Sequence, residues 1–365
     1  MIQRWKDRLV VGLAAALVLL LALWRVCRTP DALSLSERRP LAQRPAVTAT
    51  DILDGSFMSD YESYTLDQFP LRDAFRTLKA RFLTGVLQQK DNNGIYVADG
   101  YAAKLDAALN EASVDHAAER FGYIYTQYLA QSGGNVYAAA IPDKGYFLAE
   151  ANGYPAMDYA ALSDKLSDAM PYAALIDLAG VLSLEDYYHT DIHWRQEALL
   201  EAAQTLAAAM GVQLTQEYET VTLDTPFYGV YCGQSALTLA PDALCYLTNA
   251  ALEACVVYDY ETQAEIPMYD LDAAAGNDPY SMFLGGSKSL LTITNPNAET
   301  TRELIVFRDS FASSLVPLLA EGYARITLVD IRYLAPERLG SFVDFTGQDV
   351  LFLYSAPVLN SNTIA

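Results

Sequence analysis

The chain reads Leu304-Ile305-Val306-Phe307-Arg308-Asp309-Ser310-Phe311 where a wholly apolar run meets a turn. A helical pattern over residues 312–320 follows directly, and Gly322 ends it. A short, continuous apolar run followed at once by a helix is typical of a strand buried on both faces of a parallel sheet. The stretch therefore predicts a strand–turn–helix unit of an α/β fold.

Four further apolar runs of this kind occur in the chain, and helical patterns separate them. The runs lie at 136–141, 174–178, 326–330 and 350–354, and the helical patterns at 159–170, 195–210 and 336–343. Together they predict an α/β domain of three layers, with a mostly parallel five-stranded sheet covered by helices on both faces. Residues 212–300 break the alternation and are richer in Thr, Tyr, Gly and Pro, so they predict a β-rich insertion.

A separate helical pattern precedes this domain core. It opens at Pro70 and runs to about Leu87. Its apolar residues recur at near-helical spacing and are Leu71, Phe75, Leu78 and Phe82. The pattern predicts an amphipathic helix.

The N-terminus predicts a membrane anchor. Residues 9–24 carry no charge, and Arg4, Lys6 and Arg8 precede them. Basic residues on that side predict a cytoplasmic N-terminus and an extracytoplasmic body. An uncleaved signal-anchor is favoured over a cleaved signal peptide, because no clear small-x-small site follows the apolar run.

These patterns divide the chain into four parts. The expected parts are a cytoplasmic N-terminus (1–8), a transmembrane signal-anchor (9–27), a stalk (28–55) and an extracytoplasmic domain (56–365) that contains the insertion. The stalk assignment depends on its prolines and charges. The protein is thus expected to cross the cell membrane once.

Composition excludes some functions and leaves others open. The 365 residues carry a net charge of −21, which argues against a nucleic-acid partner because phosphate binding needs a basic surface. Cys232, Cys245 and Cys255 lie close together, which leaves open either a disulfide, with Cys232–Cys245 as the leading pair, or three thiols. Their spacing is not that of a zinc site.

Two of the chain's three histidines fall in Tyr188-His189-Thr190-Asp191-Ile192-His193-Trp194. Asp191 can hold one ring nitrogen of His193 and leave the other nitrogen to act as a base. The third histidine, His116, lies in a helical pattern and is expected at the surface. Capping of the following helix by Thr190 or Asp191 is compatible with this role.

Ser310 is the candidate nucleophile. It stands at a strand-to-helix turn, at the edge of the sheet where open α/β folds place their sites. Its hydroxyl would be exposed there, and nearby amides could face a developing oxyanion. A helix N-cap is the alternative role for this serine.

The stretch 188–194 resembles the signature of the DHHW family, a branch of the SGNH hydrolase superfamily that is similar to the alginate O-acetylation proteins. The likeness extends to Asp67, Phe69-Pro70-Leu71-Arg72-Asp73, Phe227-Tyr228-Gly229, Phe283-Leu284-Gly285-Gly286, Asp309-Ser310-Phe311 and Val329-Asp330-Ile331-Arg332-Tyr333. These motifs span most of the chain beyond the stalk. The resemblance implies an SGNH-like fold.

The resemblance also implies roles for individual residues. Ser310 would be the nucleophile, His193 its base and Asp191 the partner that orients His193, with an acyl-serine intermediate. Candidate substrate-binding residues are His189, Arg332 and Tyr188. No cofactor and no metal ion are expected.

Two departures from the family pattern stand out. Ile192 replaces the first histidine of Asp-His-His-Trp, although the Asp-x-His spacing is intact. The superfamily's oxyanion asparagine should follow a strand, yet Ser355-Ala356-Pro357 follows the run at 350–354 and Asn360 comes only later.

The leading functional hypothesis is a membrane-anchored, extracytoplasmic O-acyltransferase, of the O-acetyl type, or an esterase. Its substrate would be a cell-surface polysaccharide, and a multi-spanning membrane acyltransferase could be its partner. The alternative is a catalytically silent glycan-binding or assembly protein that retains the fold. A purely structural ectodomain would require the convergence of Asp191, His193 and Ser310 to be accidental.

Overall fold

The computed structural model describes residues 2–215 and 217–364. The chain divides into two compact units. The first contains Met1–Asn92 and Gly233–Thr238, and the second contains Asn93–Cys232 and Leu239–Ala365.

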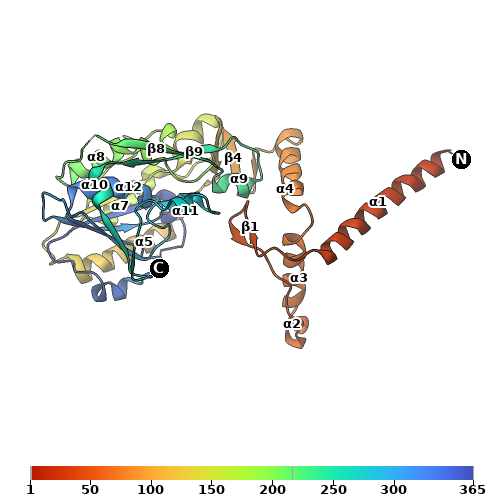
Figure 1. The fold of residues 1–365 in the computed structure, drawn as a ribbon, viewed down its shortest axis with the longest axis horizontal. Helices are drawn as coiled ribbons and strands as arrows, with labels where there is room; N and C mark the ends of the chain where they lie inside the picture. Colours follow the sequence, from red (N-terminus) through yellow and green to blue (C-terminus); the bar gives the residue numbers. More distant parts are fainter. Residues whose placement is uncertain (1, 216, 365) are drawn as a thin grey trace. The chain divides into compact units, whose positions relative to one another are not determined.

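An eight-stranded sheet forms the centre of the second unit (Figure 1), in the order β11-β10-β12-β14-β13-β15-β6-β7. The strands are β6 (Val136–Ile141), β7 (Ala174–Leu175), β10 (Val256–Asp259), β11 (Ala264–Ile266), β12 (Leu290–Thr294), β13 (Glu303–Arg308), β14 (Arg325–Val329) and β15 (Asp349–Ser355). Neighbours from β14 to β7 pair in parallel, whereas β11, β10 and β12 add antiparallel pairs beyond β14.

The sheet is therefore mixed, and the expected five-stranded sheet is wrong in its strand number. The three additional strands come from the segment 212–300. Within it, β12 buries Leu290 on one face of the sheet and Leu291 and Ile293 on the other. This pattern allows β12 to lie inside the sheet rather than in a separate insertion. The same segment also forms a two-stranded antiparallel sheet from β8 (Glu219–Phe227) and β9 (Asp242–Thr248).

Helices cover both faces of the large sheet, which gives three layers. One face packs on α8 (Leu200–Ala209) and α12 (Ala312–Leu319), and the other on α5 (Glu111–Ile124) and α7 (Tyr159–Ala169). Alternate residues of β13 enter the two cores, with Leu304 and Val306 on the α12 face and Ile305 and Phe307 on the α5 face. The continuous apolar run of this strand follows from burial on both sides.

Shorter elements complete the second unit. They are an antiparallel pair of β4 (Ile95–Ala98) and β5 (Tyr101–Lys104), and the helices α6 (Lys144–Leu148), α10 (Ala250–Ala254), α11 (Leu271–Ala274) and α13 (Ala356–Leu359). α9 (Val230–Ser235) crosses the boundary between the units.

The helix expected at 195–210 is divided into two parts. A 3₁₀ turn covers Gln196–Ala198, and α8 begins only at Leu200. The buried Gln196 side chain donates to the Ser314 carbonyl and accepts from the Leu247 amide, at 2.6 and 2.8 Å. These two bonds fix the position of the 3₁₀ turn. The helix expected at 336–343 is likewise a 3₁₀ helix, Pro336–Ser341.

The first unit is mainly helical. It contains α1 (Ile2–Cys27), β1 (Leu33–Ser34), β2 (Arg39–Pro40), α2 (Ala49–Asp54), α3 (Ser56–Asp67), α4 (Arg72–Arg81) with a π-helical continuation at Phe82–Val86, and β3 (Asp91–Asn92). Within α1, Arg4–Cys27 reaches a mean hydropathy of 2.5 and is long and apolar enough to cross a membrane. The expected helix at 70–87 corresponds to α4 and its continuation.

Replacement of Leu351 by Ala tests the central position of β15. Leu351 is completely buried between β13 and β6, so the truncation should lower the free energy of unfolding by about 2–5 kcal/mol. Urea unfolding of the full chain in detergent, followed by circular dichroism, measures the change. Leu271→Ala is the matched control, because the Leu271 side chain is exposed and its loss should change stability by less than about 0.5 kcal/mol. Equal losses in the two variants would contradict the described core.

Candidate active site

The site begins at the carboxyl end of β13, where Asp309 fixes the turn that carries Ser310. Asp309 is completely buried. One of its carboxylate oxygens accepts from the Phe311 amide at 3.0 Å, and the other accepts from the Ser355 amide and hydroxyl at 2.8 and 2.6 Å. The carboxylate therefore joins the ends of β13 and β15 and holds Ser310 at the start of α12.

Ser310, His193 and Asp191 form a continuous chain of hydrogen bonds. His193 Nε2 lies 2.8 Å from Ser310 Oγ, and His193 Nδ1 lies 2.7 Å from Asp191 Oδ1. Because ionised Asp191 can only accept, Nδ1 carries the proton and Nε2 is left as an acceptor for the Ser310 hydroxyl. The Asp191 side chain is 1% exposed and that of His193 is 13% exposed. The Asp191 end of the chain of bonds is therefore buried, and solvent reaches only the part beyond it.

A closed loop presents Asp191 and His193. Tyr187 and Trp194 pair as an antiparallel bridge at its base, and the Tyr188 amide donates to the His193 carbonyl at 3.1 Å. Inside the loop, buried Asp242 accepts from the backbone amides of His189 and Thr190 at 2.8 and 2.9 Å, and from the Thr190 hydroxyl at 2.5 Å.

Gly229 packs directly against this loop. Its amide donates to the Thr190 hydroxyl at 2.7 Å, and the Val230 amide donates to Asp191 Oδ2 at 2.8 Å. A Cβ at position 229 would lie 2.3 Å from the Asp191 backbone, which is too close for any side chain. The glycine therefore allows the 229–230 backbone to solvate the Asp191 carboxylate.

An aromatic layer fixes the plane of the His193 ring. The Tyr280 ring stacks on His193 with 3.7 Å between centroids and 6° between planes. The Tyr280 hydroxyl shares a hydrogen bond of 2.8 Å with Ser314 Oγ, which also accepts from Trp194 Nε1 at 3.0 Å. The stack is thus anchored in α12, the helix that follows Ser310.

A buried lysine lies beneath the same loop. Lys144 Nζ donates to the carbonyls of Tyr188 and His189 at 2.8 and 3.3 Å. Burial lowers the pKa of Lys144 to about 7, although the carboxylates of Asp191, Asp242 and Asp143 favour its charged form.

The three candidate substrate-binding residues differ in their surroundings. Tyr188 is completely buried and packs edge-on against Phe227. His189 has a half-exposed side chain that stacks on Tyr101, and its Nδ1 lies 3.0 Å from Asp242. Arg332 makes a fork of two bonds to Asp330, at 2.9 and 2.6 Å.

The residues around the expected oxyanion position have other partners. The Phe311 amide donates to Asp309, so the candidate donor in this turn is the Ser310 amide. Asn360 accepts from the Asn110 amide at 2.6 Å and donates to the Ala108 carbonyl at 3.0 Å. These bonds use Asn360 to hold the segment before α5, and the side chain is not available as the superfamily's asparagine.

Asp242, Tyr280 and Lys144 could not be predicted from the sequence. Each is a single polar residue far along the chain from the residues that it contacts, and no local pattern distinguishes it. Gly229 had a signal, because it belongs to the matched Phe227-Tyr228-Gly229 motif.

Neither a metal-binding cluster nor the Cys232–Cys245 disulfide is present among the described residues. Across residues 2–215 and 217–364, no cluster of three or more His, Cys, Asp or Glu side chains is arranged to hold a metal ion. Cys245 and Cys255 are thiols, with Cys245 Sγ 3.3 Å from the Thr222 hydroxyl. The disulfide considered between Cys232 and Cys245 is therefore not formed in this structure.

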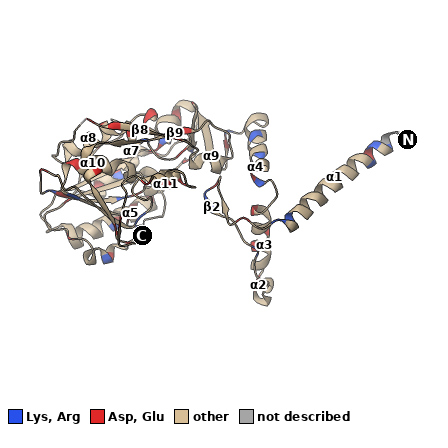
Figure 2. Ribbon diagram, in the orientation of Figure 1, with Lys and Arg blue, Asp and Glu red and all other residues tan. Residues whose placement is uncertain are grey.

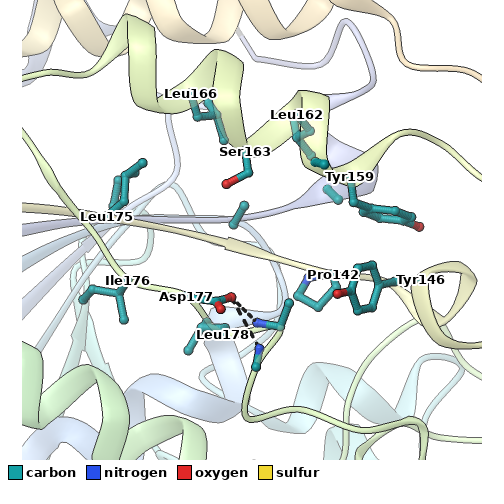
Figure 3. Close-up of a pocket in the computed structure, with 16 residues that line it drawn as sticks. Pro142, Tyr146, Tyr159, Leu162, Ser163, Leu166, Leu175, Ile176, Asp177 and Leu178 are labelled. Carbon is teal, nitrogen blue, oxygen red and sulfur yellow. Dashed lines mark hydrogen bonds between the residues drawn. The ribbon is translucent and has the colours of Figure 1, made fainter.

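A pocket of about 430 Å³ lies at the carboxyl ends of β6 and β7, at the same edge of the sheet (Figure 3). Tyr146 and Tyr159 meet edge-on along its wall, and Leu162 and Leu166 of α7 face it from above. Asp177 lies at its floor and accepts from the amides of the next turn. Its lining contains none of Asp191, His193 and Ser310, so it is distinct from the hydrogen-bonded chain.

Comparison with known proteins establishes the fold. A DHHW family protein from Eubacterium siraeum superposes with a TM-score of 0.59 at 20% identity, over 75% of this chain and 93% of that chain. PatB1 from Bacillus cereus, solved with a sulfonyl adduct, gives a TM-score of 0.58 at 17% identity, over 74% and 97%. A second PatB1 structure gives 0.56 at 17% identity, over 74% and 98%. The expected likeness to the DHHW family is thus confirmed at the level of the fold.

Sequence comparison alone gives no such match. No protein-family model matches the chain, and no curated protein matches it.

Replacement of Gly229 by Ala tests the contact between the 229–230 backbone and Asp191. The added methyl must displace the Asp191 backbone, so we expect a loss of about 1–3 kcal/mol in the free energy of unfolding. The proton shared by His193 Nδ1 and Asp191 should also lose its downfield NMR signal. Gly122→Ala is the control, because a Cβ added at position 122 in α5 would meet no atom within 4 Å. This variant should leave stability unchanged or slightly raised. An intact signal in Gly229→Ala would contradict this packing.

The Lys144 environment predicts a pH dependence of stability. Its pKa is lowered to about 7 in the folded state from 10.5, so between these values the unfolded state binds the extra proton. Stability should therefore rise with pH across this window, and the penalty should be fully present below pH 7. From pH 7 to 9 the expected gain is roughly 2 kcal/mol, measured by urea unfolding.

Lys144→Met should remove this rise, whereas Lys104→Met, which removes an exposed lysine, should retain it. The same slope in all three proteins would show that Lys144 is not the titrating group.

Proposed function

We propose that this protein is a membrane-anchored O-acyltransferase or esterase that acts on a cell-surface polysaccharide through Ser310, His193 and Asp191. The observation that carries the proposal is the chain of hydrogen bonds from Asp191 through His193 to Ser310, with distances of 2.7 and 2.8 Å. This arrangement has the geometry that activates a serine hydroxyl.

In the first step, Ser310 Oγ attacks the carbonyl carbon of an acyl donor. His193 Nε2 takes the hydroxyl proton as the new C–O bond forms, and Asp191 stabilises the resulting imidazolium through Nδ1–H. The backbone amide of Ser310 would donate a hydrogen bond to the oxyanion. Collapse of the intermediate expels the donor's leaving group, which takes the proton from His193 and leaves an acyl-serine.

In the second step, a hydroxyl group attacks the acyl-serine. His193 Nε2 removes the proton of this hydroxyl and returns it to Ser310 Oγ as the ester bond to the serine breaks. A sugar hydroxyl as attacking group gives acyl transfer, and water gives hydrolysis. The motifs shared with the alginate O-acetylation branch favour acetyl transfer to a glycan.

The anchoring part of the proposal depends on α1. Its length and hydropathy support a single membrane span, and Arg4, Lys6 and Arg8 favour a cytoplasmic N-terminus. We propose that residues 56–365 lie outside the cytoplasm, joined to the span by residues 28–55. A multi-spanning membrane acyltransferase would be the natural source of acyl groups on that side of the membrane.

The alternative function is a catalytically silent glycan-binding or assembly protein. It is favoured by the oxyanion region, because Asn360 is engaged with Asn110 and Ala108 and because Ser355 is bonded to Asp309. A missing oxyanion donor lowers the rate by about 10²–10³.

Hydrolysis of p-nitrophenyl acetate by the full chain in detergent tests the catalytic proposal. Ser310→Ala should lower kcat by at least about 10³, because the activated nucleophile is lost. Ser341→Ala, which removes an exposed hydroxyl in the same unit, should retain the activity of the unmodified chain. Equal rates in Ser310→Ala and the unmodified protein would contradict the proposed nucleophile.

Sulfonylation separates a slow enzyme from a silent protein. PatB1 has been solved with a sulfonyl adduct, and a sulfonyl fluoride needs an activated serine but no acyl donor. We expect one sulfonyl group per chain, located on Ser310 by mass spectrometry and absent from a His193→Gln variant. An unmodified chain after prolonged exposure would favour the silent alternative.

A further inference from the structure

The apolar side of α4 and its π-helical continuation faces outward. Its large apolar side chains recur at helical intervals and are Leu71, Phe75, Leu78, Phe82 and Val86. Each is between 44% and 65% exposed. An amphipathic helix normally buries this stripe, so an outward stripe marks a surface that meets something apolar. We call these five residues the α4 apolar face.

Cations flank the α4 apolar face. The ten residues of α4 contain Arg72, Arg76, Lys79 and Arg81 against a single carboxylate, Asp73 (Figure 2). Arg72 and Arg76 pair with Glu37 at 2.6 and 3.0 Å, whereas Lys79 and Arg81 are exposed. Elsewhere the balance is opposite, because the second unit holds 11 Lys and Arg residues against 35 Asp and Glu residues.

Three contacts connect the end of α3 to the end of α1 and the residues just after it. The Arg25 guanidinium, in the last turn of α1, lies 4.3 Å from the centre of the Tyr64 ring in α3. Gln68 exchanges two hydrogen bonds with the backbone of Asp31, at 2.9 and 2.8 Å. Asp31 lies only four residues beyond Cys27, so the α3–α4 junction is held close to the exit of the apolar helix.

We propose that the α4 apolar face lies in the headgroup region of the membrane that receives α1, with anionic phospholipid bound by the flanking cations. Phe and Leu on one face with Lys and Arg beside it is the composition of a helix that lies in the interface plane. The cations complement phosphate groups. The contacts between the end of α3 and the residues at the end of α1 keep the start of α4 close to the exit of the apolar helix. The inference rests on the membrane insertion of α1 and is independent of the proposed chemistry.

Hydrophobic photolabelling of the full chain tests this inference. The protein is reconstituted into vesicles of phosphatidylcholine, alone or mixed with phosphatidylglycerol, that contain a lipid with a diazirine on its acyl chain. After illumination, mass spectrometry locates the labelled residues. We expect label on α1 and on residues 71–86 in the anionic vesicles, and none at Leu271, an exposed leucine of the acidic second unit.

Two variants separate the apolar contribution from the ionic one. Phe75→Ser/Leu78→Ser/Phe82→Ser should lose the label on α4 and keep it on α1, which reports correct insertion. Lys79→Gln/Arg81→Gln should lower α4 labelling in anionic vesicles by up to about fivefold per cation, and should change little in neutral vesicles. All five side chains are exposed, so both variants should retain the urea midpoint of the unmodified chain.

Three outcomes would overturn the proposal. The first is labelled α1 with unlabelled α4 in both kinds of vesicle. The second is a photoreactive residue at position 78 that cross-links two copies of the chain rather than lipid. The third is a photoreactive residue at position 78 that, in native membranes, cross-links to another membrane protein rather than to lipid. The α4 apolar face would then bind a protein.

Discussion

The arrangement of the site depends on buried carboxylates that accept hydrogen bonds from backbone amides. Asp191, Asp242 and Asp309 are each at least nine-tenths buried, and a charge removed from water is costly unless hydrogen bonds replace its hydration. The donors come from segments far apart in sequence: Val230 for Asp191, His189 and Thr190 for Asp242, and Ser355 for Asp309. Satisfying these charges therefore fixes the loop 188–193 and the ends of β13 and β15 in one arrangement, and the hydrogen-bonded site is a consequence of that arrangement.

The site and the core share one helix. α12 fills the core with its apolar residues, follows Ser310 directly, and uses Ser314 to hold Tyr280 and Trp194. The Tyr280 ring therefore holds the imidazole of His193. Ser314 anchors this ring in α12, the same helix that follows Ser310. Changes in core packing under α12 should shift Ser310 and the Tyr280 stack together, which preserves the relation between serine and histidine better than separate supports would.

The sequence predicted strands and helices whose residue types repeat along the chain. It did not predict contacts between single residues that lie far apart in the sequence. The runs at 304–307 and 350–354 identify strands because both faces are apolar, and Asp191, His193 and Ser310 lie together at the edge of the sheet where the motifs suggested. β10 was missed because Val256-Val257-Tyr258-Asp259 lies in a segment rich in polar and turn residues. Asp242 and Tyr280 were missed because a single residue in contact with a distant loop leaves no periodic trace.

The two edge strands of the large sheet are very short: β7 has two residues and β11 has three. An edge strand exposes unpaired amides and carbonyls that can recruit a strand from another molecule, and shortness limits the number of such bonds. If α1 anchors the protein as proposed, the chain meets its neighbours in two dimensions, at a higher local concentration than in solution. The short edge strands leave neighbouring molecules few backbone groups with which to form a continuous sheet. Crowding on a membrane surface therefore need not lead to ordered aggregation.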